Sequence, residues 1–140
     1  MNRKYLVISS LGITLLLVVA IVWTYLGGEQ RELVYVYDES ILHDFWIDDS
    51  GYVTFNCDIT IKNRSNTEMK FTMTADVSKD IGLTKETFAY SFKGDSQNYE
   101  VYNIAPNSKQ TYKVEFKALN GDKKTKMDRL PPKEVILSPL

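Results

Sequence analysis

Cys57 and His43, the one cysteine and the one histidine of this 140-residue sequence, are the side chains best suited to nucleophilic or acid–base chemistry. A cysteine attacks as its thiolate, so a catalytic cysteine needs an accessible position and neighbours that lower its pKa. Cys57 instead shares the apolar side of an alternating segment with Phe55 and Ile59. Unpaired cysteine is among the most buried residue types, so we interpret Cys57 as a core residue. One histidine and one cysteine cannot supply the usual zinc ligands, and we expect no metal and no cofactor.

The segment T-F-N-C that ends at Cys57 resembles the T-L-x-T-C strand of sortases, which use a cysteine, a histidine and an arginine. This resemblance implies that His43 and Arg64 would act beside Cys57 in a surface enzyme. The inward direction of Cys57, the separation of only 14 positions from His43 and the small size of the domain argue against it. We therefore predict a protein that is not an enzyme, with a cysteine-based surface enzyme as the alternative.

The segment D-D-S-G at residues 48–51 lacks the spacing of a calcium-binding loop. Aspartate and serine bond to their own backbone and glycine accepts a positive φ, so these residues are typical of a hairpin turn. The segment N-R-S at 63–65 matches a glycosylation sequon, and the neighbouring residues 63–66 have turn chemistry.

Basic side chains are concentrated near the C-terminus. Residues 29–106 carry 14 acidic and 7 basic side chains, whereas residues 107–140 carry 8 basic and 4 acidic ones. The candidate contact residues for an anion or a membrane surface are Lys123, Lys124, Lys126 and Arg129. The alternative is a solvated strand face and an exposed loop, which is the commoner meaning of a charge run. Nucleic acid is not an expected partner.

Apolar and polar residues alternate with period two through most of the chain after residue 32, which predicts half-buried strands. The clearest strand is Tyr52–Lys62, with Val53, Phe55, Cys57, Ile59 and Ile61 on one face. Two further strands with alternating faces are expected at Met69–Val77 and Gln110–Ala118. Weaker strands are expected at Leu33–Asp38, Ile41–Ile47, Thr87–Phe92, Tyr99–Ile104 and Glu134–Ser138. Seven or eight short antiparallel strands with turn signals between them predict an all-β sandwich.

A 22-residue run without charged side chains, Tyr5–Leu26, precedes this β-rich part. About 20 apolar residues are enough to cross a bilayer, so we expect a transmembrane signal-anchor helix at 5–26. A cleaved signal peptide is the alternative, although the run is long and lacks a small-x-small cleavage site. Arg3 and Lys4 predict a cytoplasmic tail at 1–4, which leaves a linker at 27–32 and an extracytoplasmic domain at 33–140. An exported domain without disulfides is typical of Gram-positive bacterial surfaces.

Two neighbouring motifs are similar to the passage from strand E to strand F in fibronectin type III and other immunoglobulin-like domains. They are Ile104-x-Pro106 and T-Y-x-V-x-F-x-A at 111–118. The resemblance implies that residues 110–118 form strand F. Tyr112 would then bond back to the backbone at the corner between strands. It also implies that the connection 119–133 joins strands F and G at the pole where the domain begins. Its lysines would then lie close to the bilayer.

The sequence thus predicts a single-pass cell-membrane protein with an immunoglobulin-like β-sandwich outside the membrane. We expect a non-catalytic binding or accessory module of a cell-envelope complex, in contact with the bilayer and with an envelope or membrane-protein partner. A structural or stress-related envelope protein without a discrete ligand is the alternative.

Overall fold

The computed structural model describes residues 31–94, 96–126 and 128–140. Residues Glu32–Leu140 form one compact unit. Its elements are β1 (Leu33–Tyr35), η1 (a 3₁₀ turn, Tyr37–Glu39), β2 (Ile41–Ile47), β3 (Tyr52–Asn63), β4 (Met69–Asp76), η2 (a 3₁₀ turn, Ser78–Asp80), β5 (Phe88–Ser91), β6 (Tyr102–Ile104), β7 (Lys109–Leu119) and β8 (Val135–Pro139). Eight antiparallel strands and almost no helix confirm the expected all-β class. No helix in the described residues is long and apolar enough to cross a membrane, and the segment 5–26 lies outside them.

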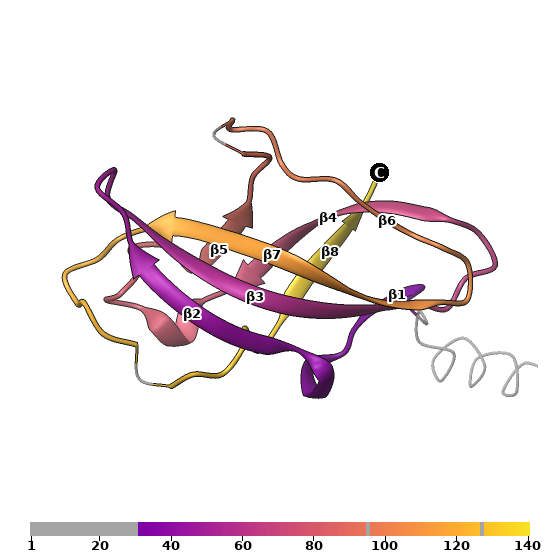
Figure 1. Cartoon of the computed structure of the whole chain (residues 1–140), viewed down its shortest axis with the longest axis horizontal. Helices are drawn as coiled ribbons and strands as arrows, with labels where there is room; N and C mark the ends of the chain where they lie inside the picture. The colour runs from indigo at the N-terminus through magenta and orange to yellow at the C-terminus, as the bar shows by residue number, and fades with distance from the viewer. Residues whose placement is uncertain (1–30, 95, 127) are drawn as a thin grey trace, which may run out of the picture. The chain divides into compact units, whose positions relative to one another are not determined.

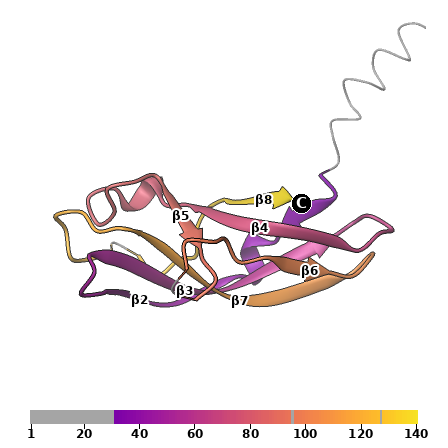
Figure 2. The same cartoon turned by 90° about the horizontal axis from the view of Figure 1, so that it is seen from above.

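The strands form two facing layers that are joined at one side, as Figures 1 and 2 show. In one layer, β7 pairs with one edge of β3 along its whole length. β1 and β2 pair with different parts of the other edge of β3. In the other layer β4 pairs with β8, β5 and β6. Strand β5 also pairs with β7 through Tyr90 and Ser91, which links the two layers into one continuous sheet.

The core lies between these layers and consists of the side chains that the alternating pattern predicted to point inward. Strand β3 contributes five apolar side chains that are at most 2% exposed, Cys57 among them. Phe71 and Met73 on β4 face Val114 and Phe116 on β7, and all four are almost completely buried. Burial of an apolar side chain of this size contributes about 1.5–3 kcal/mol, so this contact between the layers favours folding strongly.

The first strand is shorter than expected, because the chain leaves the sheet after Tyr35 and forms η1. The Ser40 hydroxyl donates to the Val36 carbonyl (2.9 Å) and accepts the Thr60 amide (3.0 Å), so it replaces a strand partner for β3. The Thr60 hydroxyl in turn donates to the carbonyl of Glu39 (2.9 Å). Thr60 lies on the face of β3 opposite to Ile59 and Ile61, and it is nevertheless 1% exposed because η1 covers this part of that face.

The turn at residues 63–66 is organised by a buried asparagine. The Asn63 amide donates to the carbonyls of Thr67 (2.8 Å) and Ala105 (3.0 Å), and its oxygen accepts the amide (2.9 Å) and hydroxyl (2.8 Å) of Ser65. This confirms the turn chemistry predicted from the sequence. Asn63 is 0% exposed, so the sequon at 63–65 does not present its side chain for glycosylation in the folded domain.

The assignment of residues 110–118 to strand F is wrong. β7 pairs with β3 over its full length, from Lys109 opposite Lys62 to Leu119 opposite Tyr52. Strand F of an immunoglobulin-like sandwich lies in the layer opposite to strand B, whereas strand E lies beside B. With β3 compared to strand B, the position of β7 beside it is not that of strand F. The expected bond of Tyr112 is nevertheless present, since its hydroxyl donates to the Asn103 carbonyl at 2.5 Å.

The connection 120–133 consequently runs from one layer to the other, and its first residues lie far from the start of the domain. Leu33 pairs with Asn63 at one end of β3, and Leu119 pairs with Tyr52 at the other end. At about 3.3 Å per residue, these two ends of β3 are roughly 35 Å apart. The expectation that the lysines at 123–124 share a pole with Leu33 is therefore wrong. Only the last residues of the connection come back to β1, where the Tyr35 hydroxyl donates a hydrogen bond to the Pro132 carbonyl (2.7 Å).

Candidate functional site

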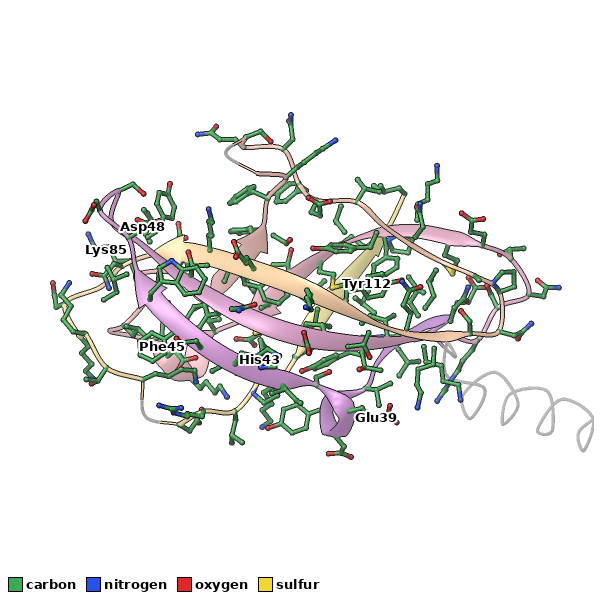
Figure 3. All side chains as sticks on the ribbon, in the orientation of Figure 1. Glu39, His43, Phe45, Asp48, Lys85 and Tyr112 are labelled. Carbon is green, nitrogen blue, oxygen red and sulfur yellow. The ribbon has the colours of Figure 1, made fainter. Side chains whose placement is uncertain are left out.

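The residues that suggested a cysteine nucleophile are not brought together in an open site. The Cys57 side chain points into the core and is 0% exposed. His43 lies on the outer side of the same layer, where its Nε2 atom is 2.9 Å from Asp58 Oδ2 (Figure 3). Arg64 is exposed beyond the end of β3. The inward position of Cys57 that the alternation predicted is confirmed.

Burial raises the pKa of the Cys57 thiol to about 12, so the thiol is protonated at neutral pH. We expect the full chain in detergent to react slowly with 5,5′-dithiobis(2-nitrobenzoate) at pH 8, and to react fully once denatured. Because the folded pKa exceeds the unfolded value of about 9, the buried thiol favours the folded state below pH 9. That contribution is lost as the pH rises towards 12. Rapid stoichiometric labelling of the native chain at pH 8 would contradict the burial of Cys57.

Lys126, one of the four predicted contact residues, is part of the folded interior. Its side chain is 2% exposed, and its Nζ atom lies 3.1 Å from Asp80 Oδ1 and 2.8 Å from Asp128 Oδ1. Lys79 also approaches Asp128 (3.6 Å) and donates to the Pro131 carbonyl (3.1 Å). This ion-pair cluster fastens the connection 120–133 onto η2. Lys126 is therefore not available to a membrane surface in this structure.

The other three predicted residues, Lys123, Lys124 and Arg129, have exposed positions in the same connection. Its beginning is held by backbone bonds from Gly121 to the Leu83 carbonyl (2.7 Å) and from Lys123 to the Gly82 carbonyl (2.9 Å). A Cβ at position 121 would lie only 2.1 Å from the Gly82 oxygen, so this close approach requires glycine. Lys124 donates to the Asn120 side chain (2.6 Å). These lysines extend from a fixed backbone at the end of the domain opposite Leu33.

An open cleft with a different lining lies beside the turn between β2 and β3. Its volume is about 490 Å³, within the usual range for ligand sites. Three separate segments build it: the turn between β2 and β3, the connection between β5 and β6, and the end of β7. The lining residues are Asp48, Ser50, Tyr52, Phe92, Gly94, Ser96, Gln97, Tyr99 and Lys117.

The turn at residues 48–51 fixes one wall of this cleft. Asp48 Oδ1 accepts the Ser50 hydroxyl (2.6 Å) and the Tyr52 amide (2.9 Å), and Gly51 has a φ of +84°. The hydrogen bond from Ser50, followed by that from Tyr52, lowers the pKa of the Asp48 carboxyl, which is therefore ionised at neutral pH. Figure 3 shows Asp48 at this end of the domain, on the turn. The hairpin turn predicted for this segment is confirmed.

Two aromatic side chains, Phe92 and Tyr99, line the cleft beyond this turn, and Tyr90 packs against both of them. Phe92 and Tyr99 are stacked with ring centroids 5.6 Å apart and an interplanar angle of 15°, and Tyr90 lies 5.8 Å from Tyr99. The backbones of Phe92 and Tyr99 also pair with each other. Tyr99 is 49% exposed. The cluster therefore stands on the outer surface of the domain and presents an aromatic face to solvent.

The sequence analysis missed this cluster, although β5 carries a signal for it. Its inward side chains are the small residues Ala89 and Ser91, which are 0% and 3% exposed, whereas Phe88, Tyr90 and Phe92 point outward. Outward aromatics over inward small residues reverse the usual arrangement of a half-buried strand. Exposed aromatic side chains gathered in one place are characteristic of binding surfaces.

No group of three or more histidine, cysteine or carboxylate side chains suited to hold a metal ion lies within the described part of the chain. No protein-family model, curated protein or solved structure matches this sequence. The function therefore has to be argued from the site itself.

Proposed function

We propose that this chain is a membrane-anchored, extracytoplasmic binding module of a cell-envelope complex, without catalytic activity of its own. Residues 1–4 stay in the cytoplasm, 5–26 span the bilayer as an uncleaved anchor, 27–32 form a linker and 33–140 bind outside the membrane. The uncharged 22-residue run and its basic N-terminal flank support this placement. The absence of internal disulfides supports a bacterial source.

The strand order supports an immunoglobulin-like sandwich, although none of the strands in the described residues takes the place of the last of the usual seven. β1 and β2 take the place of strand A beside β3 as strand B, and β7 follows as strand E. In the facing layer, β4 and β8 pair as strands C and F do. Loops at the ends of such sandwiches are the usual binding surfaces, because a rigid scaffold positions them.

The observation that carries the proposal is the open cleft between the turn 48–51 and the aromatic cluster. A protein that served only as a structural spacer would not need aromatic side chains on its solvent face beside a fixed polar turn. The buried, protonated thiol of Cys57 argues against the cysteine-based enzyme. A structural or stress-related envelope protein without a discrete ligand remains the second candidate, and the next experiment separates the two.

A photoreactive benzoylphenylalanine at Gln97 tests the proposal in the native membrane of the full chain. Gln97 is exposed and lines the cleft, so the variant should capture an extracytoplasmic component on irradiation. The matched control carries the same group at Tyr37, an exposed residue on η1 outside the cleft. Selective capture at Gln97 supports a binding module. Equal capture at both positions, or none at either, would favour the structural alternative.

A further inference from the structure

The aromatic cluster offers a flat apolar surface rather than a cage. Phe92 stacks on Tyr99 at an interplanar angle of 15°, and Tyr99 is still half-exposed, so part of its ring is open to solvent. Tyr52 also lines the cleft, and the ring of Tyr90 packs against Tyr99 at a tilt of 48°. A cage for a quaternary ammonium ion needs rings that surround the cation from several directions. Near-parallel rings on an open surface instead suit a ligand that has a flat apolar face of its own.

The polar lining provides both hydrogen-bond donors and acceptors and carries opposite charges. Asp48 is held at the turn by Ser50, and a carboxylate can accept about four hydrogen bonds, so acceptor capacity remains beyond its two internal ones. Gln97 offers an amide, and Lys117 offers an ammonium group from β7. One carboxylate and one ammonium group give this lining almost no net charge. The lining therefore offers no net electrostatic attraction to a strongly anionic polymer or to a cation.

We propose that the cleft binds an uncharged saccharide chain, with a sugar ring lying on the exposed face of Tyr99 and its hydroxyl groups bonded to Asp48, Gln97 and Lys117. A pyranose ring combines a face of C–H groups with a rim of hydroxyls that both donate and accept, which matches an aromatic floor with a mixed polar rim. Because the cleft is open at the surface, it accommodates a length of chain and not only an end. This assignment rests on the proposed function and names the ligand class of the same site.

Isothermal titration of the purified full chain in detergent micelles provides the test, with chitotetraose and cellotetraose as probes. Binding of either sugar supports the proposal, and preference for chitotetraose would indicate an N-acetylated wall glycan rather than another polysaccharide. Choline chloride and polyphosphate are titrated in parallel, as a cation and a polyanion. Absence of binding to both sugars, or binding only to choline or polyphosphate, would overturn the proposal. Capture at Gln97 in the membrane would still support a binding module with another ligand.

Substitution of Tyr99 shows whether the bound sugar uses this cleft. Tyr99→Leu keeps an apolar side chain but removes the flat ring, and it should weaken sugar binding about tenfold or more, as truncation of an aromatic anchor does. Tyr99→Phe keeps the ring and should bind within about twofold of the original chain. Gln97→Ala tests the rim without touching the stacked rings, and Tyr37→Leu is the control outside the cleft. Sugar binding that is unchanged in Tyr99→Leu and Gln97→Ala would overturn the assignment.

Discussion

Lys126→Met is expected to lower the free energy of unfolding by about 3–5 kcal/mol, because it leaves the buried Asp80 carboxylate without its partner. The two side chains are 2% and 6% exposed, and their charged atoms are 3.1 Å apart. Typical domains are stable by only about 5–15 kcal/mol, so this loss is a large fraction of the total. Chemical denaturation of the full chain in detergent measures it. A Trp23→Phe background leaves Trp46 on β2 as the single tryptophan reporter.

Lys124→Met is the matched control, since it removes the same charge from an exposed position in the same connection. We expect it to change stability by no more than about 0.5 kcal/mol. The double variant Asp80→Leu/Lys126→Met removes both buried charges and should recover most of the loss, because apolar replacement of a buried pair is often neutral. Equal small effects of Lys124→Met and Lys126→Met would show that Lys126 is a surface residue after all.

Phe71→Ala is expected to destabilise the domain by about 3–5 kcal/mol, which is the range for removing a phenylalanine ring from a packed core. Phe71 is 0% exposed and lies on β4, the strand that pairs with three others. Its ring also packs at centroid distances of 5.9 Å against both Tyr102 and Tyr112, and the substitution removes these two aromatic contacts. The same denaturation measurement, with Trp46 as the reporter, gives the value.

Phe88→Ala is the control for Phe71→Ala, because it makes the same chemical change on β5 at a side chain that is 38% exposed. It should cost less than about 1 kcal/mol. Similar losses in the two variants would contradict the division into an inward face on β4 and an outward aromatic face on β5.

The alternation of apolar and polar residues was sufficient to predict the strands and the core. On β3, β4 and β7 each residue predicted to point inward is buried or packs against the core, because one face of every strand must meet the other layer. Local patterning could not reveal that the chain leaves the sheet at Val36. That break depends on Ser40 meeting Thr60, two residues that are 20 positions apart in the sequence.

The order of the strands was harder to predict than their positions. The sequence around Tyr112 indicated a tyrosine that bonds back to the preceding strand, and that bond exists. The same local pattern could not show which strand lies beside β7, since pairing with β3 rather than β4 is decided by long-range packing. Because residues 110–118 were assigned to strand F, the connection that follows them was expected at the end of the domain where Leu33 lies. Lys123 and Lys124 were therefore predicted at the wrong end of the domain.

The candidate site was predicted least well, for two physical reasons. A run of lysines gives no information about burial, so Lys126 could not be distinguished from Lys124 until Asp80 was seen beside it. The cleft combines Asp48, Phe92 and Lys117 from three segments that are distant in the sequence, and no local spacing relates them. The outward aromatics of β5 were the one local feature that indicated it.

The central claim is that residues 33–140 lie outside a membrane that the retained segment 5–26 crosses. Single cysteines in a Cys57→Ala background test it in intact cells with a membrane-impermeant maleimide. Glu68→Cys, at an exposed position in the turn before β4, should be labelled at once. Asn2→Cys should be labelled only after the membrane is permeabilised, on a band of full-length mass. Labelling of Glu68→Cys only after permeabilisation, or a mature chain that has lost residue 2, would contradict the account.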